Sequence, residues 1–191
     1  LVDFLKDRIK KDDEILIQYD ETSVTDAIKG YLTILSQLHT NTIKVIGYPL
    51  NNDFASFKNN IKDNASGIFI FQIDADEVPS EYLVENLSEF IEFNKDVDLF
   101  FVPRINTVAG LTPKHVKKWN WNISQNGWVN FPDYQTRIYR RTSEIEWVGK
   151  VHERITGYNT FSNFPAEEQF CLYHHKQIER QEKQNSFYAT I

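Results

Sequence analysis

The chain has 191 residues, a formal net charge of −6 and 41% hydrophobic residues, which suits one domain with a sizeable core. The negative charge argues against a nucleic-acid partner. The single cysteine, Cys171, excludes an intrachain disulfide and fits a reducing compartment, and no apolar run is long enough to cross a bilayer. We therefore expect a cytoplasmic protein without a transmembrane segment.

Strand and helix signals alternate through the first part of the chain. Ser23 or Thr25 is placed to cap one of the helices. We expect helices at residues 2–9, 25–38 and 53–64, and strands at residues 14–20 and 42–47. Such alternation predicts a parallel sheet with helical crossovers. Because a helix pattern opens the sequence, we also expect a strand to precede it.

An apolar run at residues 68–73 ends in three carboxylates, those of Asp74, Asp76 and Glu77. Its aromatic and β-branched residues predict a strand buried on both faces of a parallel sheet. An amphipathic helix at residues 81–93 follows, so both aspartates should lie just past the strand's carboxyl end, where open α/β sheets bind ligands. A cation would offset the repulsion, and carboxylates suit Mg²⁺ or Mn²⁺. The alternative is a charged turn, with Glu77 near the positive end of the helix.

The pattern changes after residue 93. Residues 104–131 are rich in Asn, Gly, Lys and Trp and have weak periodicity, so we expect a long loop region with one short helix. Pro103 limits the pairing of the strand that precedes this region. We expect strands at residues 97–103, 136–140 and 170–175, a short apolar segment within residues 146–153, and a polar helix at residues 176–188.

The order of several motifs resembles family-2 glycosyltransferases of the GT-A fold, over nearly the whole chain. Residues 69–79, with Asp-Ala-Asp-Glu, resemble the metal-site strand of that family, and this is the one specific motif. Residues 15–26 resemble its strand and turn that end in Asp-x-x-Ser-x-Asp, and residues 57–60 resemble its Arg/Lys-Asn segment. The later segments 132–139 and 149–153 resemble bacterial members related to lipopolysaccharide-core glucosyltransferases.

The resemblance implies a GT-A-like, Rossmann-type α/β fold with a mixed, mostly parallel sheet flanked by helices, whose first strand is missing here. It implies one domain over residues 1–191, with a nucleotide-sugar-binding half (1–95) and an acceptor-side half (96–191). The implied activity is inverting, metal-dependent transfer of a sugar from a nucleotide-sugar donor, a UDP-sugar first of all, to a hydroxyl of a saccharide acceptor. The implied location is cytoplasmic, free or peripheral to a membrane.

The same resemblance and the chemistry of the residue types assign candidate roles. Mn²⁺ or Mg²⁺ would neutralise the leaving diphosphate and act as a Lewis acid. The metal ligands would be Asp76 and Asp74, with His152 as a third because imidazole suits Mn²⁺. A general base must take the acceptor's proton, and Glu153 and Asp133 are both candidates. The remaining donor-binding candidates are Asp20, Lys58, Asn59 and Arg137.

Other residues keep two interpretations each. Arg104, Arg137 and Lys58 would meet donor phosphates or form surface ion pairs. His174 and His175 would finish a strand or contact phosphate, and His152 would be structural or a ligand. Four aromatic residues would stack on sugars or form a small core beneath the loop; they are Trp119, Trp121, Trp128 and Phe131.

Two other classes of function are open at this stage. A nucleotidyltransferase or a metal-dependent phosphohydrolase also uses clustered carboxylates on an α/β sheet, although no Gly-rich basic phosphate loop is visible in the chain. A degenerate transferase would bind carbohydrate without turnover. Release of pyrophosphate would favour the first, and sugar binding that ignores nucleotide and metal would favour the second.

Overall fold

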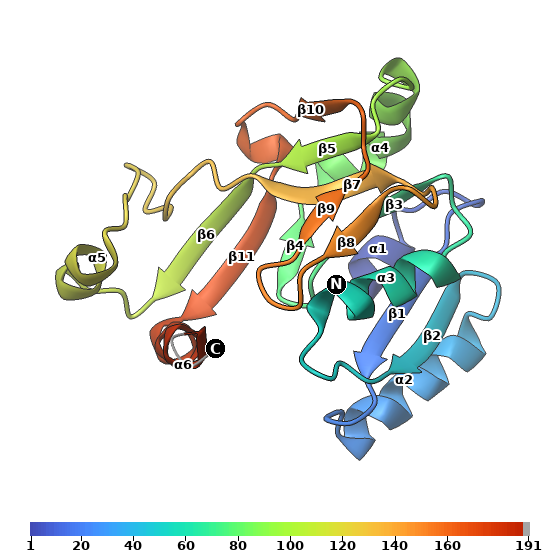
Figure 1. The fold of residues 1–191 in the computed structure, drawn as a ribbon, viewed down its shortest axis with the longest axis horizontal. Coiled ribbons are helices and arrows are strands. Elements are labelled where there is room, and N and C mark those ends of the chain that lie inside the picture. The colour runs from blue at the N-terminus through green and yellow to red at the C-terminus, as the bar shows by residue number, and fades with distance from the viewer. Residues whose placement is uncertain (189–191) are drawn as a thin grey trace.

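The structure is a computed structural model that describes the backbone of residues 1–188 and the side chains of residues 1–183 (Figure 1). Its helices are α1 (Val2–Lys6), α2 (Asp26–Leu38), α3 (Phe54–Asn64), α4 (Glu81–Phe93), α5 (Pro113–Trp119), the 3-10 turn η1 (Glu168–Phe170) and α6 (Ile178–Tyr188). Its strands are β1 (Ile15–Asp20), β2 (Ile43–Tyr48), β3 (Phe69–Phe71), β4 (Glu77–Pro79), β5 (Leu99–Val102), β6 (Arg104–Ala109), β7 (Gln135–Arg140), β8 (Glu146–Val148), β9 (Arg154–Thr156), β10 (Phe161–Asn163) and β11 (Leu172–Gln177).

The amino-terminal part forms the expected parallel unit. β1 and β2 pair in parallel, with Ile15 opposite Ile43, and α2 makes the crossover between them. Thr25 caps α2, because its side chain accepts the Ile28 N–H, so of the two expected caps the structure uses Thr25. Leu32 and Leu35 of α2 pack on the inward residues of both strands, and apolar residues of α1 join this core. The apolar residues that alternate along β1 and β2 therefore point toward the face of the sheet that α1 and α2 cover.

A second sheet has the strand order β10-β5-β7-β3 and carries most of the core. β7 runs antiparallel to both β5 and β3, and β10 runs parallel to β5. β3 is therefore an edge strand with one partner among the described residues, and Ile68 just before it is 73% exposed. The expectation of a strand buried on both faces of a parallel sheet is wrong for this segment, because only β7 pairs with it.

The third sheet, β4-β11-β6, corrects the prediction of a loop from residue 104 onward. β6 pairs in parallel with β11 from Arg104↔Leu172 to Ala109↔Gln177, and β4 pairs antiparallel with β11. Figure 1 shows β6 and β11 running side by side toward α5 and α6. Pro103 is fully buried between β5 and β6, so the chain passes there from the second sheet to the third. α5 is the expected short helix.

The fold class is thus mixed α/β with several small mixed sheets. Parallel pairs (β1–β2, β5–β10, β6–β11) and antiparallel pairs (β3–β7, β5–β7, β4–β11, β8–β9) occur together. The expected single, mostly parallel, Rossmann-type sheet is not seen among the described residues, because the alternating β/α signal ends after α4 and the later strands pair in both directions. None of the helices in the described residues is long and apolar enough to span a membrane.

Candidate functional site

The three carboxylates of the acidic motif follow β3, as expected, but they do not stay together. Glu77 enters β4 and is fully buried, whereas the side chains of Asp74 and Asp76 are 42% and 27% exposed. A hydrogen bond of 2.9 Å from the Glu77 N–H to the Asp74 carbonyl closes the turn between them. The turn therefore sends one acid into the protein and leaves two at its surface.

Glu77 is held by two arginines. Arg137 donates from Nε and Nη2 at 2.9 and 2.7 Å, and Arg104 donates from Nη1 at 2.7 Å. Burial by itself raises the pKa of Glu77, but the charges and hydrogen bonds of Arg137 and Arg104 outweigh burial and lower that pKa below its ordinary value. Ser80 caps α4 by accepting the Leu83 N–H at 3.2 Å. Glu77 is thus a buried ion-pair partner, and capping of the helix falls to Ser80.

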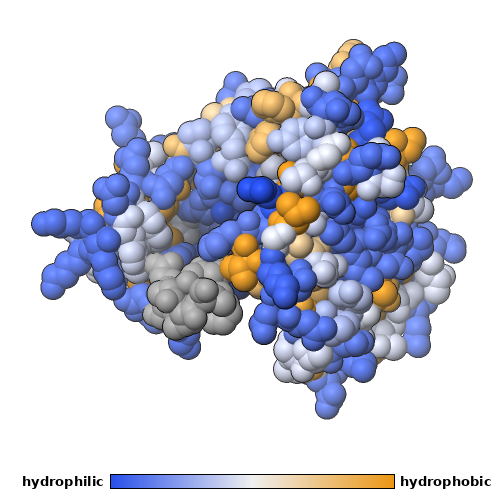
Figure 2. Space-filling view, in the orientation of Figure 1, coloured by the Kyte–Doolittle hydropathy of each residue, from blue (hydrophilic) through white to orange (hydrophobic). Residues whose placement is uncertain are grey.

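Asp74 and Asp76 face a polar cavity of about 250 Å³. Figure 2 shows that the face of the molecule seen in Figure 1 is mainly hydrophilic, with hydrophobic residues in small separate groups. Charged side chains of both signs line the cavity: Lys58, Arg104, Arg137, Lys176, Asp74, Asp76 and Glu153. The other lining residues are Gln135, Thr136, Trp147 and His174. Six of the charged residues that the sequence singled out, from five segments of the chain, therefore meet at one place.

Asp76 has two cationic or potentially cationic neighbours. His174 Nε2 lies 3.4 Å and Arg180 Nη2 lies 3.0 Å from Asp76 Oδ2. The hydrogen bond from His174 and the charges of His174 and Arg180 hold the pKa of Asp76 well below its usual range, although burial opposes them. The Arg180 side chain is 65% exposed, so its pair with Asp76 is a surface contact that a ligand can replace.

His174 also links the cavity to the buried arginines. Its Nδ1 donates to Asn106 Oδ1 at 2.7 Å, and Asn106 Nδ2 donates to Asp133 Oδ2 at 2.7 Å. Asp133 accepts two further hydrogen bonds on the same oxygen from Arg104, at 2.9 and 2.7 Å. A chain of polar contacts thus runs from Asp76 to Glu77 through β11 and β6, which fixes the imidazole of His174.

The two candidate bases differ in their surroundings. Glu153 lines the cavity and accepts one hydrogen bond, from Lys58 at 2.6 Å. Asp133 accepts from Arg104, Asn106 and Gln135 and is not among the lining residues. Because a base needs a lone pair that faces the substrate, this geometry favours Glu153.

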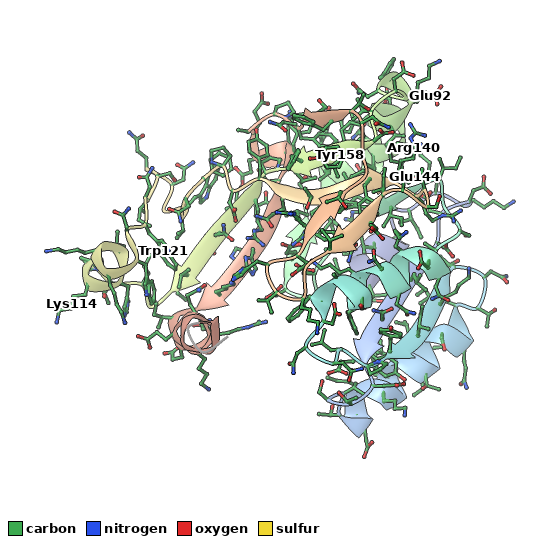
Figure 3. All side chains as sticks on the ribbon, in the orientation of Figure 1. Glu92, Lys114, Trp121, Arg140, Glu144 and Tyr158 are labelled. Carbon is green, nitrogen blue, oxygen red and sulfur yellow. The ribbon has the colours of Figure 1, made fainter. Side chains whose placement is uncertain are left out.

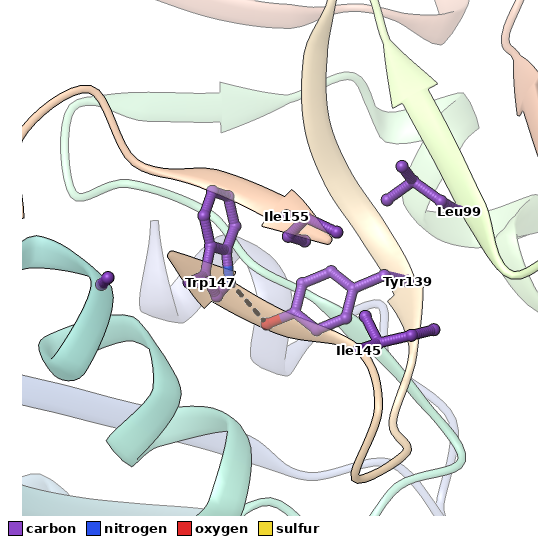
Figure 4. Close-up of a cluster of buried hydrophobic side chains, with 6 residues drawn as sticks. Leu99, Tyr139, Ile145, Trp147 and Ile155 are labelled. Atoms are coloured by element: carbon purple, nitrogen blue, oxygen red, sulfur yellow. Dashed lines mark hydrogen bonds between the residues drawn. The ribbon is translucent and has the colours of Figure 1, made fainter. Parts of the chain in front are cut away.

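Lys58 and Glu153 are placed by an aromatic residue beneath them. The Lys58 ammonium lies 4.2 Å from the centre of the Trp147 ring. The Trp147 backbone is clamped by the Asn59 side chain, which accepts the Trp147 N–H at 2.9 Å and donates to its carbonyl at 2.8 Å. Trp147 Nε1 donates to Gln72 Oε1 at 3.0 Å and to the Tyr139 hydroxyl at 3.2 Å (Figure 4). Asn59 therefore fixes β8 against α3, and both the oxygen and the nitrogen of its side-chain amide are engaged in this contact.

Besides Asp133 and Asn59, two further sequence candidates lie outside the cavity lining. Asp20 accepts from Thr22, Ser23 and the Leu50 N–H at 2.6–3.1 Å, and these hydrogen bonds lower its pKa to about 2. It therefore holds the turn after β1. His152 is exposed, with a left-handed backbone at φ 55°, and is not among the lining residues. The imidazole that faces Asp76 is that of His174.

Sequence reasoning gave His174 a minor place and did not name Lys176, Gln135 or Thr136. In β11 side chains alternate between faces, so of two adjacent histidines one must point inward. The structure selects His174, which is buried opposite Glu77 and Asn106, while His175 is exposed. The alternation of side chains along a strand therefore predicted that one of the two histidines points inward. Which one does so depends on how β11 pairs with β4 and β6. Burial and the charge of Arg104 lower the pKa of Lys176.

The candidate metal ligands form an incomplete set. Among the side chains of residues 1–183, no three His, Cys, Asp or Glu are grouped to hold a metal ion by themselves. Asp74 accepts from Arg137 Nη2 at 2.5 Å, and Asp76 is paired as described. Mg²⁺ is usually held by one or two carboxylates together with substrate phosphates. Two aspartates on one cavity fit that kind of site, in which metal and phosphate bind together.

Compared with protein-family models and with curated proteins, the chain shows no match. The geometry of the site therefore carries the functional argument.

Proposed function

We propose that this protein is a metal-dependent, inverting glycosyltransferase that moves a sugar from a nucleotide-sugar donor to a hydroxyl of a saccharide acceptor. One observation carries the proposal: Asp74, Asp76 and Glu153 line the same cavity as four cationic side chains. Transfer from a donor of this kind brings its diphosphate, its sugar and the hydroxyl of the acceptor together at one point. It needs groups that neutralise phosphate and a group that removes a proton.

The cations of the cavity suit the diphosphate end of the donor. Arg104 and Arg137 are already rigid, because Glu77 fixes both guanidinium groups from behind. Ordered guanidinium groups bind phosphate oxygens with little further loss of side-chain entropy. A bound Mn²⁺ or Mg²⁺, held by Asp76 and Asp74, would supply further neutralisation of the charge that grows on the leaving diphosphate.

Glu153 suits the role of base. Among the described side chains it accepts one hydrogen bond, from Lys58, which leaves lone pairs for an acceptor hydroxyl. Lys58 is itself held over Trp147, so the pair keeps a defined position at the cavity wall. Transfer in a single displacement with inversion needs one such base.

The test is mutual dependence of metal and nucleotide binding. Titration calorimetry of UDP with and without Mn²⁺ should show that each tightens the other. Asp76→Asn should weaken Mn²⁺-dependent UDP binding by about 10- to 100-fold, the loss expected for a charged contact. Asp63→Asn, at an exposed acid of α3 outside the cavity, is the matched control and should bind as the wild type does.

Product analysis separates this proposal from its rivals. A panel of nucleotide sugars with Mn²⁺ should release a nucleoside diphosphate. Independent binding of UDP and Mn²⁺, or equal turnover of the wild type and Asp76→Asn, would overturn the proposed role of Asp76. Release of pyrophosphate would point to nucleotidyl transfer instead.

A further inference from the structure

A second cavity, of about 130 Å³, adjoins the first. Arg104 and Lys176 line both cavities, so they stand at the boundary between them. Residues of β6 form one wall of the second cavity. The segment that follows α5 forms another wall and contributes Trp121 and Asn130. A ligand group in this cavity would therefore lie next to whatever the first cavity holds.

The segment that carries Trp121 and Asn130 is fixed to β6. The Val129 N–H donates to the Asn106 carbonyl at 2.9 Å, and isolated bridges join Val129 to Asn106 and to Ile123. The side-chain oxygen of Asn130 accepts the Asn122 N–H at 2.8 Å. This wall of the cavity is thus built from the backbone and does not depend on side chains alone.

Trp121 has a defined place in that wall. Its backbone N–H donates to the Val116 carbonyl at 3.0 Å. The centre of its ring lies 4.7 Å from the centre of the Trp119 ring. Figure 3 shows Trp121 close beside α5. The other aromatic residues of the region are engaged elsewhere: Trp119 stacks on His115 at 5.2 Å, and Trp128 packs on Phe131 at 4.8 Å. The aromatic residues therefore form small stacks, and Trp121 is the one that lines this cavity.

The lining has the chemistry that recognises carbohydrate. An indole offers a flat apolar surface for the C–H face of a sugar ring, and amides and hydroxyls offer partners for its hydroxyl groups. Asn106, Thr107 and Asn130 line the cavity together with Trp121 and supply such groups, each of which also has a hydrogen-bond partner within the protein.

We infer that the second cavity binds the acceptor saccharide, with Trp121 as the surface on which a sugar ring stacks. This inference rests on the proposed function for the direction of transfer. The acceptor hydroxyl would point across the boundary formed by Arg104 and Lys176 into the first cavity, where Glu153 lies.

Saturation-transfer NMR on the full chain tests this with maltose, lactose and N,N′-diacetylchitobiose as probes. At least one should bind the wild type, and Trp121→Ala should weaken that binding about tenfold or more, the loss expected for an aromatic stacking partner. Trp128→Ala, in the same segment but outside the cavity lining, is the matched control and should keep saccharide binding. Trp121→Phe retains a ring and should give an intermediate affinity, which distinguishes stacking from misfolding.

A failure of this inference can be distinguished from a failure of the proposed donor site. Titration of UDP with Mn²⁺ should give the same affinity in Trp121→Ala and in the wild type. Binding of none of the three saccharides, equal saccharide binding by Trp121→Ala and the wild type, or displacement of the bound saccharide by uridine would overturn the inference. Saccharide binding that needs Trp121, in a protein that binds no UDP, would sustain the second cavity as a carbohydrate site and reject the glycosyltransferase.

Discussion

The acidic motif builds two regions with opposite properties. Glu77 is fully buried and shares its two oxygens among Arg137, Arg104 and the Asp74 N–H. Asp74 and Asp76, one to three residues earlier, are partly exposed and line the cavity. Neighbours in sequence have thus been separated by one turn into a buried ion-pair centre and a cavity wall.

The comparison shows that a buried carboxylate and a carboxylate at a cavity wall need different kinds of partners. A buried charge must have all its lone pairs satisfied, and then it fixes its partners in place. A carboxylate at a cavity wall needs partners that can yield, and the exposed Arg180 beside Asp76 meets that condition. We infer that Glu77 positions the arginines and that the two aspartates meet the ligand.

The largest effect is expected from Glu77→Ala. The substitution leaves Arg137 buried without its main partner, and removal of one member of a buried ion pair costs about 3–5 kcal/mol of unfolding free energy. Asp76→Asn should cost less, about 1–2 kcal/mol, because Arg180 is largely exposed and the asparagine oxygen can still accept a hydrogen bond from His174. Urea unfolding monitored by tryptophan fluorescence measures both. Equal losses in the two variants would abolish the distinction between the two regions.

Local signals in the sequence predicted the part of the fold around β1, β2 and α2–α4. These helices begin at capping residues such as Thr25 and Ser80 and show a 3.6-residue apolar period, so their bounds were close. β6 was missed because the adjacent polar residues Asn106 and Thr107 interrupt the alternation of polar and apolar residues that marks a strand. Its pairing with β11, residues 104–109 with 172–177, is non-local and no sequence window contains it.

The same limit governs the site. Asp74, Asp76, Lys58, Arg137 and Glu153 were named from the sequence, and the structure brings them to one cavity. The contacts behind these residues could not be foreseen in the same way, since the roles of His174 and Asp133 depend on the register of β11 and β6. Exposure of Ile68 likewise follows from which strands flank β3, and the composition of the strand does not contain that information.

Glu153 and Asp133 extend the comparison to the candidate bases. Glu153→Gln should lower kcat about 10²- to 10⁴-fold, the usual contribution of a general base, and should also cost about 1–3 kcal/mol of unfolding free energy because it removes the charge that Lys58 faces. Asp133→Asn removes the charge that Arg104 faces, so it should cost about 1–3 kcal/mol of unfolding free energy and affect kcat less. Steady-state kinetics and urea unfolding of both variants decide. A folded Asp133→Asn variant with the larger loss of kcat would reverse the assignment.

The smallest expected effect is a pH dependence that belongs to Glu77. Its pKa in the folded protein lies below the ordinary value of 4.5 because of Arg137 and Arg104, in spite of burial. The stability that Glu77 contributes is therefore complete above pH 4.5 and is lost as the pH falls toward the lowered pKa, while the unfolded chain takes up the proton first. Glu77→Gln has no titrating group at this position, so the difference in unfolding free energy between the wild type and the variant should shrink as the pH falls below 4.5. Urea unfolding of both proteins at pH 7, 5, 4 and 3.5 measures the difference. A difference that stays constant over this range would mean that the charge of Glu77 contributes nothing to the fold, and that its arginines are held by packing alone.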